Sequence, residues 1–344
     1  MFEGQWEKRW NPLRQEWVIY AAHRNSRPWS FDGIPPKNEK PEYDKSCYLC
    51  PTNPRVHGEK NPNYKGVFIF NNDHPVVGEN APEVHEDRHD GLYKRRSATG
   101  IAKVICYDPR HNVTLSDVSL RRVFDVFKAF QSEMKEFLKH PKIKSVFIFE
   151  NKGEVVGVSN PHPHCQIYAT DFVFTQIQLQ LNEADRQRRL FGHNLFEEII
   201  KAEQKDQIRI VSENENAIAF IPFFARYAYE VMVFPKRKHQ SLITMDETEL
   251  MDFSKCIQEV IRKFDLNFQM SFPYMMTLFQ APVDGNSYPE YHFHVLFLPP
   301  LRQPGLLKYL GGPESAGGNF MADTMPEAKA EELNRVDLSK FIEK

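Results

Sequence analysis

The chain has 344 residues, of which 41% are hydrophobic and 26% charged, a balance typical of a globular protein with room for two cores. Its 44 basic and 46 acidic residues give a net charge of −2, so nothing in the composition favours a nucleic-acid or membrane-surface partner. It has no apolar run of membrane-spanning length and no pattern of a signal peptide. An odd number of cysteines, 5, argues against a disulfide framework. We therefore expect a cytoplasmic protein.

The first half of the chain is predicted to contain short strands and one long helix. Apolar and aromatic runs predict strands at residues 17–21, 67–70, 103–107 and 145–149, and a Pro- and Lys-rich loop spans about residues 35–45. Between the last two strands, apolar residues recur at spacings of three and four from Val123 to Phe137. This spacing predicts an amphipathic helix, with Ser116 as its N-cap.

The second half repeats this order. Strands are predicted at residues 217–221, 230–234, 274–279 and 291–298, and an amphipathic helix from Glu247 onward. The separation between His111 and His239 along the chain nearly equals that between His164 and His294. Two similar orders of elements with matching landmarks predict a diverged tandem duplication.

The stretch with the most chemical content is Ser-Asn-Pro-His-Pro-His-Cys-Gln at residues 159–166. Alternate residues of an extended segment share a face, so we expect His162, His164 and Gln166 in one row and Cys165 packed on the opposite face. A neutral imidazole is a good nucleophile near pH 7, and a carboxamide can hold a phosphoryl oxygen. The motif therefore indicates phosphorus chemistry; the alternative is two surface histidines on an edge strand.

At this motif the chain resembles the histidine-triad superfamily, specifically its galactose-1-phosphate uridylyltransferase branch, whose pattern Ser-Asn-Pro-His-Pro-His-x-Gln is matched at every fixed position. Hydrolases of the superfamily carry a third His where this chain has Gln166. The resemblance covers about residues 10–331. It implies an α+β fold, a duplicated histidine-triad-like fold whose two tandem halves share an antiparallel sheet flanked by helices. We expect these halves at residues 1–185 and 186–344, with the zinc site and the nucleophile in the first.

The resemblance implies the activity of a UDP-glucose–hexose-1-phosphate uridylyltransferase, in the Leloir pathway of galactose metabolism. His164 would attack the α-phosphorus of UDP-glucose, releasing glucose 1-phosphate and leaving a uridylyl-histidine. Galactose 1-phosphate would then take the uridylyl group in the second half of a ping-pong exchange. Gln166 would hold the phosphoryl oxygens in both steps, and His292 and His294 would be duplicated scaffold.

Cys47 and Cys50 form a Cys-x-x-Cys pair, which can supply two thiolates to a zinc ion. Many such pairs are never completed, so two buried thiols are the alternative. The resemblance adds His111 and His162 as the remaining ligands of one structural ion, either zinc or iron. Such an ion would anchor the start of the strand that presents His164.

Family members can also hold a second metal with a glutamate and three histidines. In this chain Gln180, Gln280 and Leu296 occupy three of those positions, and only His294 remains. Glu183 is a nearby carboxylate. Because one imidazole does not hold a metal, we expect no ion at this second site.

The resemblance also implies the contacts with substrate. It further implies a homodimer in which the partner subunit supplies the residues that contact the hexose. Planar guanidinium groups suit phosphate recognition. No counterpart of the family's hexose-side glutamine is found; Phe320 falls nearest. The implied residues are Arg24 and Arg27 near the phosphates, Asn72 and Asp73 at the uridine and ribose, Asn151, Gly157 and Ser159 at the phosphates, and Lys308, Tyr309 and Glu314 at the hexose.

Two alternatives remain open. A sister nucleotidylyltransferase, such as an ADP-glucose phosphorylase, would use the same histidine with another nucleotide. Its motif usually lacks both prolines, so Pro161 and Pro163 favour the uridylyl interpretation. A zinc-stabilised protein that binds UDP-sugars without turnover is the second alternative, and the intact pair His164 and Gln166 argues against it.

Overall fold

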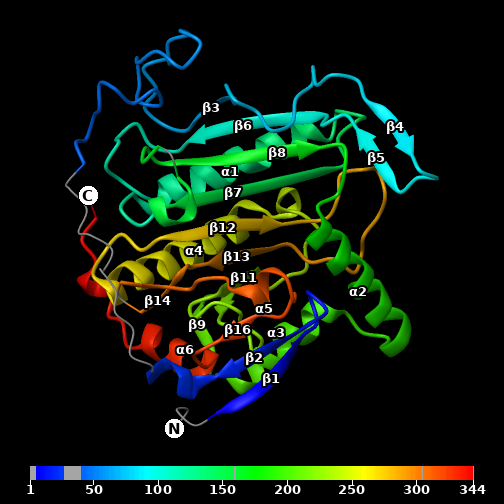
Figure 1. The fold of residues 1–344 in the computed structure, drawn as a ribbon. Helices are drawn as coiled ribbons and strands as arrows, with labels where there is room; N and C mark the ends of the chain where they lie inside the picture. Colours follow the sequence, from blue (N-terminus) through cyan, green and yellow to red (C-terminus); the bar gives the residue numbers. More distant parts are fainter. Residues whose placement is uncertain (1–4, 27–39, 159, 304, 344) are drawn as a thin grey trace.

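The structure is a computed structural model that describes residues 5–26, 40–158, 160–303 and 305–343 (Figure 1). Arg27 and Ser159, both predicted to bind substrate, lie outside the described residues. Within the described ranges, no helix combines the length and the apolar composition needed to cross a membrane.

A nine-stranded sheet runs through the centre of the molecule, with the order β3-β6-β8-β7-β12-β13-β11-β10-β9. Each pair of neighbouring strands is antiparallel. The first half of the chain supplies β3, β6, β7 and β8 and the second half the other five, and the halves join where β7 pairs with β12. The strands are β3 (Phe68–Asn71), β6 (Gly100–Cys106), β7 (Ser145–Lys152), β8 (His164–Thr170), β9 (Ile210–Glu213), β10 (Ala217–Phe220), β11 (Val231–Pro235), β12 (Tyr274–Phe279) and β13 (His294–Leu298).

Helices cover the two faces of this sheet. Helices α1 (Leu120–Phe137) and α4 (Glu247–Phe268) pack side by side on one face, where they form the largest apolar core with alternate residues of the strands (Figure 1). Helices α2 (Thr175–Phe191) and α3 (Leu195–Asp206) pack on the other face, against strands of the second half. The same face of the first half is therefore not covered by this pair of helices.

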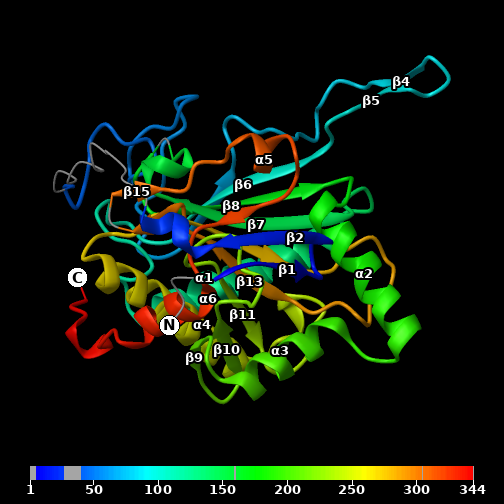
Figure 2. The ribbon, with the colours of Figure 1, turned by 60° about the horizontal axis from the view of Figure 1, so that its bottom comes forward.

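Smaller elements surround the sheet. Strands β1 (Trp6–Asn11), β2 (Glu16–Ala21) and β16 (Met321–Ala322) form a three-stranded sheet, and β14 (Leu301–Gln303) pairs with β15 (Leu306–Leu307). Strands β4 (His85–Arg88) and β5 (Tyr93–Arg96) form a hairpin that projects from the body (Figure 2). Helices α5 (Gly312–Ser315) and α6 (Pro326–Asn334) follow near the C-terminal end.

The arrangement confirms the predicted α+β class and the repeated order of elements. The order β6-α1-β7-β8 recurs as β11-α4-β12-β13, and the two sets lie on opposite sides of the β7–β12 pair. The predicted apolar stripes of both long helices are buried. Helices α2 and α3 and the strand pairs β4–β5 and β14–β15 were not predicted. The division of the chain at residue 185 stays a prediction.

Some predicted boundaries are wrong. Helix α1 begins after Ser119, whose hydroxyl accepts a hydrogen bond from the Arg122 N–H, whereas the Ser116 hydroxyl donates to Asp265 of α4 at 2.6 Å. Ser116 therefore connects the segment before α1 to α4 and caps neither helix. Strand β13 begins at His294, three residues later than predicted.

Candidate active site and metal centre

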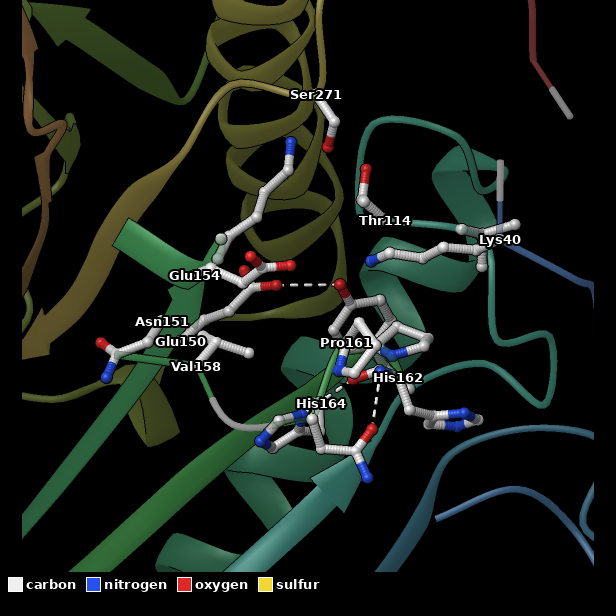
Figure 3. A pocket seen from close by; sticks show the side chains of 16 residues that line it. Lys40, Thr114, Glu150, Asn151, Glu154, Val158, Pro161, His162, His164 and Ser271 are labelled. Carbon is white, nitrogen blue, oxygen red and sulfur yellow. Dashed lines mark hydrogen bonds between the residues drawn. The ribbon is translucent and has the colours of Figure 1, made fainter. Parts of the chain in front are cut away.

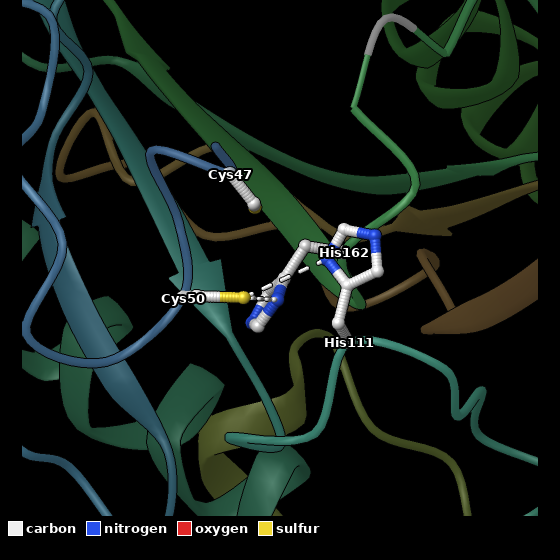
Figure 4. Close-up of side chains that lie close together, drawn as sticks. All are labelled: Cys47, Cys50, His111 and His162. Carbon is white, nitrogen blue, oxygen red and sulfur yellow. Dashed lines mark hydrogen bonds between the residues drawn. The ribbon is translucent and has the colours of Figure 1, made fainter. Parts of the chain in front are cut away.

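The four predicted metal ligands converge on one buried point. Cys47 and Cys50 lie on a tight turn, closed by the hydrogen bond from the Cys50 N–H to the Cys47 carbonyl. His111 follows strand β6 and His162 precedes strand β8. The possible ligand atoms of all four residues lie within 4.8 Å of one another, and all four side chains are buried (Figure 4). Residues far apart in the sequence thus form one cluster.

The donor atoms suit a tetrahedral Cys₂His₂ site. Cys50 Sγ lies 3.6 Å from His111 Nδ1 and 3.5 Å from His162 Nδ1. Burial, together with the neighbouring histidines, lowers the pKa of His162 to about 3, so the ring is neutral and can donate a lone pair. Burial raises the pKa of the Cys50 thiol to about 12, and a bound cation would reverse this shift by stabilising the thiolate. The donor set fits zinc.

Two amide side chains support this cluster. The Asn160 side chain lies 3.5 Å from Cys47 Sγ and accepts the His162 N–H at 2.9 Å. Asn53 donates to the Cys47 carbonyl at 2.8 Å. These bonds hold the backbone on both sides of the cluster, a role the sequence analysis did not assign, although Asn160 lies inside the motif it singled out.

His164 is the first residue of β8, directly after the metal cluster. Its Nδ1 lies 2.8 Å from the carbonyl oxygen of His162, so Nδ1–H donates to that carbonyl and Nε2 keeps its lone pair. Burial lowers the pKa of His164, so the ring is neutral near pH 7.

The predicted row of three side chains is wrong at its first member. Strand β8 begins at His164, because Pro163 has no N–H to donate to a ladder and the His162 ring turns towards Cys50. His164 and Gln166 do share a face, and Cys165 is fully buried on the opposite face, as predicted. One histidine therefore belongs to the metal cluster and the other to the pocket.

Gln166 lies beside a residue predicted to bind the nucleoside. Its Oε1 accepts hydrogen bonds from Asn72 Nδ2 at 3.4 Å and from the Tyr168 hydroxyl at 3.3 Å. Because Oε1 is the acceptor in both contacts, the amide NH₂ remains to donate to an anionic oxygen.

His164 lines a cavity of about 170 Å³ at the end of β7 and the start of β8 (Figure 3). A complete nucleotide sugar needs a larger site, so this cavity can take only a small part of one, such as a phosphate group. Asn151 lines the same cavity from β7. In the β7–β8 ladder Phe149 pairs with Gln166, and continuing this register sets Asn151 opposite His164.

A buried carboxylate supports the floor of this cavity. Glu150 accepts hydrogen bonds from the hydroxyls of Tyr107 at 2.8 Å and of Tyr274 at 2.9 Å. Burial raises the pKa of Glu150. This network ties the end of β6 and β12 to β7 and was missed by the sequence analysis, because a Glu beside Asn151 carries no signal of its own in the sequence.

The remaining predicted substrate residues lie on several elements. Arg24 forms an ion pair with Asp323 at 3.6 Å, which brings the N-terminal 3₁₀ helix against the C-terminal segment. The Asp73 carboxylate lies 3.9 Å from Arg55 Nη1. Gly157 adopts a left-handed conformation, φ +82°, next to the motif.

The predicted hexose residues lie on the segment around α5. The Lys308 ammonium bonds to the Glu314 carboxylate at 2.5 Å, and both side chains are largely buried. Tyr309 beside them is 57% exposed. Phe320 lies under the Lys308 ammonium, 5.0 Å from ring centre to Nζ.

The positions compared with the family's second metal site form ordinary protein contacts. Gln180 accepts a hydrogen bond from the Tyr291 hydroxyl at 2.6 Å, and Gln280 donates to the Val146 carbonyl at 3.2 Å. The His294 ring stacks on Phe279 at 5.0 Å between centroids. The expectation that no ion binds here stays a prediction.

The sheet thus brings a buried Cys₂His₂ cluster next to His164 and Gln166 in the first half of the chain. Comparison with known families assigns the chain to a class of enzyme. Residues 3–173 match the N-terminal domain, and residues 175–343 the C-terminal domain, of galactose-1-phosphate uridyl transferase. The chain therefore belongs to the galactose-1-phosphate uridyl transferase family.

Individual relatives agree with this assignment. A galactose-1-phosphate uridylyltransferase of Haemophilus influenzae is 34% identical over 98% of this chain and 96% of its own. A solved uridylyltransferase structure superposes with a TM-score of 0.76 at 28% identity, covering 95% and 97% of the two chains. An ADP-glucose phosphorylase of Arabidopsis thaliana has the same fold, with a TM-score of 0.77, 21% identity and coverage of 97% and 99%. The chain is thus an enzyme of the transferase class.

Proposed function

We propose that this chain exchanges UMP between UDP-glucose and galactose 1-phosphate through a uridylyl-His164 intermediate. The observation that carries the proposal is the 2.8 Å contact between His164 Nδ1 and the His162 carbonyl, beside a cavity of phosphate size. It leaves Nε2 as the nucleophilic nitrogen. Family membership supplies the substrate class.

In the first step, Nε2 of His164 attacks the α-phosphorus of UDP-glucose. The bond from that phosphorus to the bridging oxygen breaks, and glucose 1-phosphate leaves with the electron pair. The ring gains positive charge as the N–P bond forms, and the carbonyl that accepts Nδ1–H stabilises this charge. The second step reverses the first, with galactose 1-phosphate as the attacking group.

Gln166 and Asn151 are suited to bind the phosphoryl oxygens during both steps. Both side chains are neutral amides, which donate hydrogen bonds without releasing a proton. A third histidine at position 166 could instead protonate a leaving group or activate water. An amide there favours a uridylyl-histidine that survives until the second sugar phosphate binds.

Cys47, Cys50, His111 and His162 would hold one zinc ion. A bound ion would cross-link the Cys-x-x-Cys turn to the segment after β6 and the segment before β8. The four donors would leave no open position for substrate. His162 would then have two roles, because its ring ligates and its carbonyl orients His164. We assign the site a structural role.

The remaining assignments follow the family. We propose that Arg24, Arg27, Gly157 and Ser159 contact the phosphates and that Asn72 and Asp73 contact the nucleoside. Lys308, Tyr309 and Glu314 would contact the hexose of a partner subunit's site in a cytoplasmic homodimer. The two halves would be residues 1–185 and 186–344.

The test is the intact mass of zinc-loaded protein mixed with UDP-glucose and no acceptor. We expect a gain of one uridylyl group, mapped to His164, that galactose 1-phosphate discharges. A gain from ADP-glucose but not from UDP-glucose would identify a sister enzyme with another nucleotide. Tight binding of UDP-glucose without any adduct would contradict the proposed exchange and favour a protein that binds UDP-sugars without turnover.

A further inference from the structure

Tyr64 connects the cysteine turn of the metal cluster to the His162 ring. Its hydroxyl lies 2.7 Å from the carbonyl oxygen of Leu49, inside the Cys47–Cys50 turn, and 2.8 Å from Nε2 of His162. Its ring is 8% exposed and stacks on Phe68 of β3, with centroids 5.1 Å apart. The hydroxyl is therefore held in place by packing between the thiol turn and an imidazole.

Counting protons decides the direction of these two hydrogen bonds. A phenol has one hydrogen to donate, and a carbonyl oxygen can only accept. The hydroxyl of Tyr64 therefore donates to Leu49 and accepts from His162, so Nε2 of His162 carries the proton. The lone pair then lies on Nδ1, the nitrogen that faces Cys50 Sγ at 3.5 Å (Figure 4).

We propose that Tyr64 is a positioning residue that selects the Nδ1-ligating tautomer of His162 and aims its ring at the metal. The inference rests on the proposed metal site and adds a residue outside the ligand set. Hydrogen bonds to the second nitrogen of a ligating histidine commonly set its orientation and basicity. Tyr64 does this for His162 and also holds the Cys-x-x-Cys turn through Leu49.

The same contact bears on the nucleophile. The main-chain carbonyl of His162 accepts Nδ1–H of His164, so movement of the His162 residue would also disturb the aim of Nε2. Tyr64 acts on His164 only through His162. Its loss should lower kcat while leaving the KM for UDP-glucose close to its original value.

The matched control is Tyr43, which lies beside the same turn. Its hydroxyl donates to Asn53 Oδ1 at 2.5 Å and lies 3.2 Å from the Pro51 carbonyl. In the described structure these contacts reach neither histidine of the cluster. Tyr43→Phe therefore removes a phenol hydroxyl that reaches the cysteine turn only through Asn53 and leaves the His162 ring untouched.

The experiment measures zinc affinity of the full chain by competition with a chelator, for the original protein, Tyr64→Phe, Tyr43→Phe and Cys50→Ser. We expect Tyr64→Phe to weaken zinc binding by about 10- to 100-fold and Tyr43→Phe to change it by less than about threefold. Equal affinities for Tyr64→Phe and Tyr43→Phe would overturn the role of Tyr64 while leaving the metal site in place. If the original protein binds zinc no better than Cys50→Ser, the metal site itself is wrong.

A second measurement on the unmutated protein guards against a variant that fails to fold. Long-range ¹H–¹⁵N correlation spectra of the zinc-loaded protein report which nitrogen of His162 carries the proton. We expect a protonated Nε2 and a metal-bound Nδ1. The opposite assignment would overturn the proposal, whatever the variants do.

Discussion

His164 and His294 are the first residues of β8 and β13, two strands that occupy matching places in the two halves of the sheet. Each ring donates through Nδ1 to the carbonyl two residues earlier, at 2.8 Å from His164 and 2.9 Å from His294. The local geometry is thus the same in both halves. It cannot by itself make a histidine reactive.

The surroundings of the two rings differ. His294 is completely buried and stacks between Phe279 and Phe234, each with its centroid 5.0 Å away, and its Nε2 has no partner among the described residues. His164 is partly exposed and lines a cavity. Helices α2 and α3 pack over the second half, whereas the segment from Cys47 to Tyr64 packs on part of the corresponding face of the first. The two histidines therefore differ in whether a substrate can reach the ring.

The preceding histidines differ in the same way. The ring of His162 faces Cys50 and Tyr64, whereas neither nitrogen of His292 has a hydrogen-bond partner in the described parts of the chain. Among the described residues, His292 belongs to no group of side chains that could hold a metal ion. One half has a supported donor cluster, and the other has a buried neutral ring.

The largest effect should come from removing the exposed ring. We expect His164→Gly to lower the exchange rate by at least about 10³-fold and to abolish the uridylyl adduct, because the nucleophile is lost. His294→Phe, which keeps an aromatic ring in the stack, should retain at least about a tenth of the rate. Rates of exchange and intact masses, with circular dichroism to confirm folding, measure both.

An adduct that persists in His164→Gly would contradict the assignment of the nucleophile. An equal loss of exchange in folded His294→Phe would show that the second half takes part in the reaction.

The second largest effect should come from removing the metal, and it should appear in the stability of the folded chain. Zinc at 1,000 times its dissociation constant should stabilise the folded chain by about 4 kcal/mol, since the four donors converge only in the folded state. Cys50→Ser should abolish this stabilisation. Cys256→Ser is the control, because Cys256 is a buried thiol of α4 outside the cluster. Thermal unfolding with and without zinc measures the difference.

A zinc-dependent Tm that survives in Cys50→Ser would place the metal elsewhere. A Tm of the unmutated protein that does not respond to zinc would contradict the structural role of the site.

The smallest effect concerns pH. Burial lowers the pKa of His294 to about 4, well below the value of about 6.5 in an unfolded chain. The unfolded chain therefore binds a proton first as the pH falls, and stability is lost between about pH 6.5 and pH 4, by about 1.4 kcal/mol per pH unit for this ring. Phe234, Phe279 and the hydroxyl-bearing Tyr291 face it, and none offers a charge to offset the proton.

His294→Phe should flatten this part of the stability curve. The measurement is the free energy of unfolding by urea across that pH range, compared with the unmutated protein. Parallel curves for the two proteins would show that His294 is not a source of the acid sensitivity.

The sequence was a good guide where the signal was local. The amphipathic stripe from Val123 to Phe137 identified α1, and the octapeptide at residues 159–166 identified the family. Boundaries failed where a tertiary contact decided them. Ser116 has the chemistry of a cap, yet Asp265 takes its hydroxyl, and Ser119 starts the helix.

Residue types and spacing predicted the repeated order of elements, because this depends on periodicity. The resemblance carried by one contiguous motif predicted the fold class and the candidate nucleophile. The resemblance already assigned His162 to the metal and His164 to the substrate, and the tertiary structure shows the contacts that turn one ring towards Cys50 and the other towards the cavity. It also showed the Glu150 network and the contact of Tyr64 with His162. These contacts join residues distant in the chain, and nothing in the spacing of a single sequence records such a meeting.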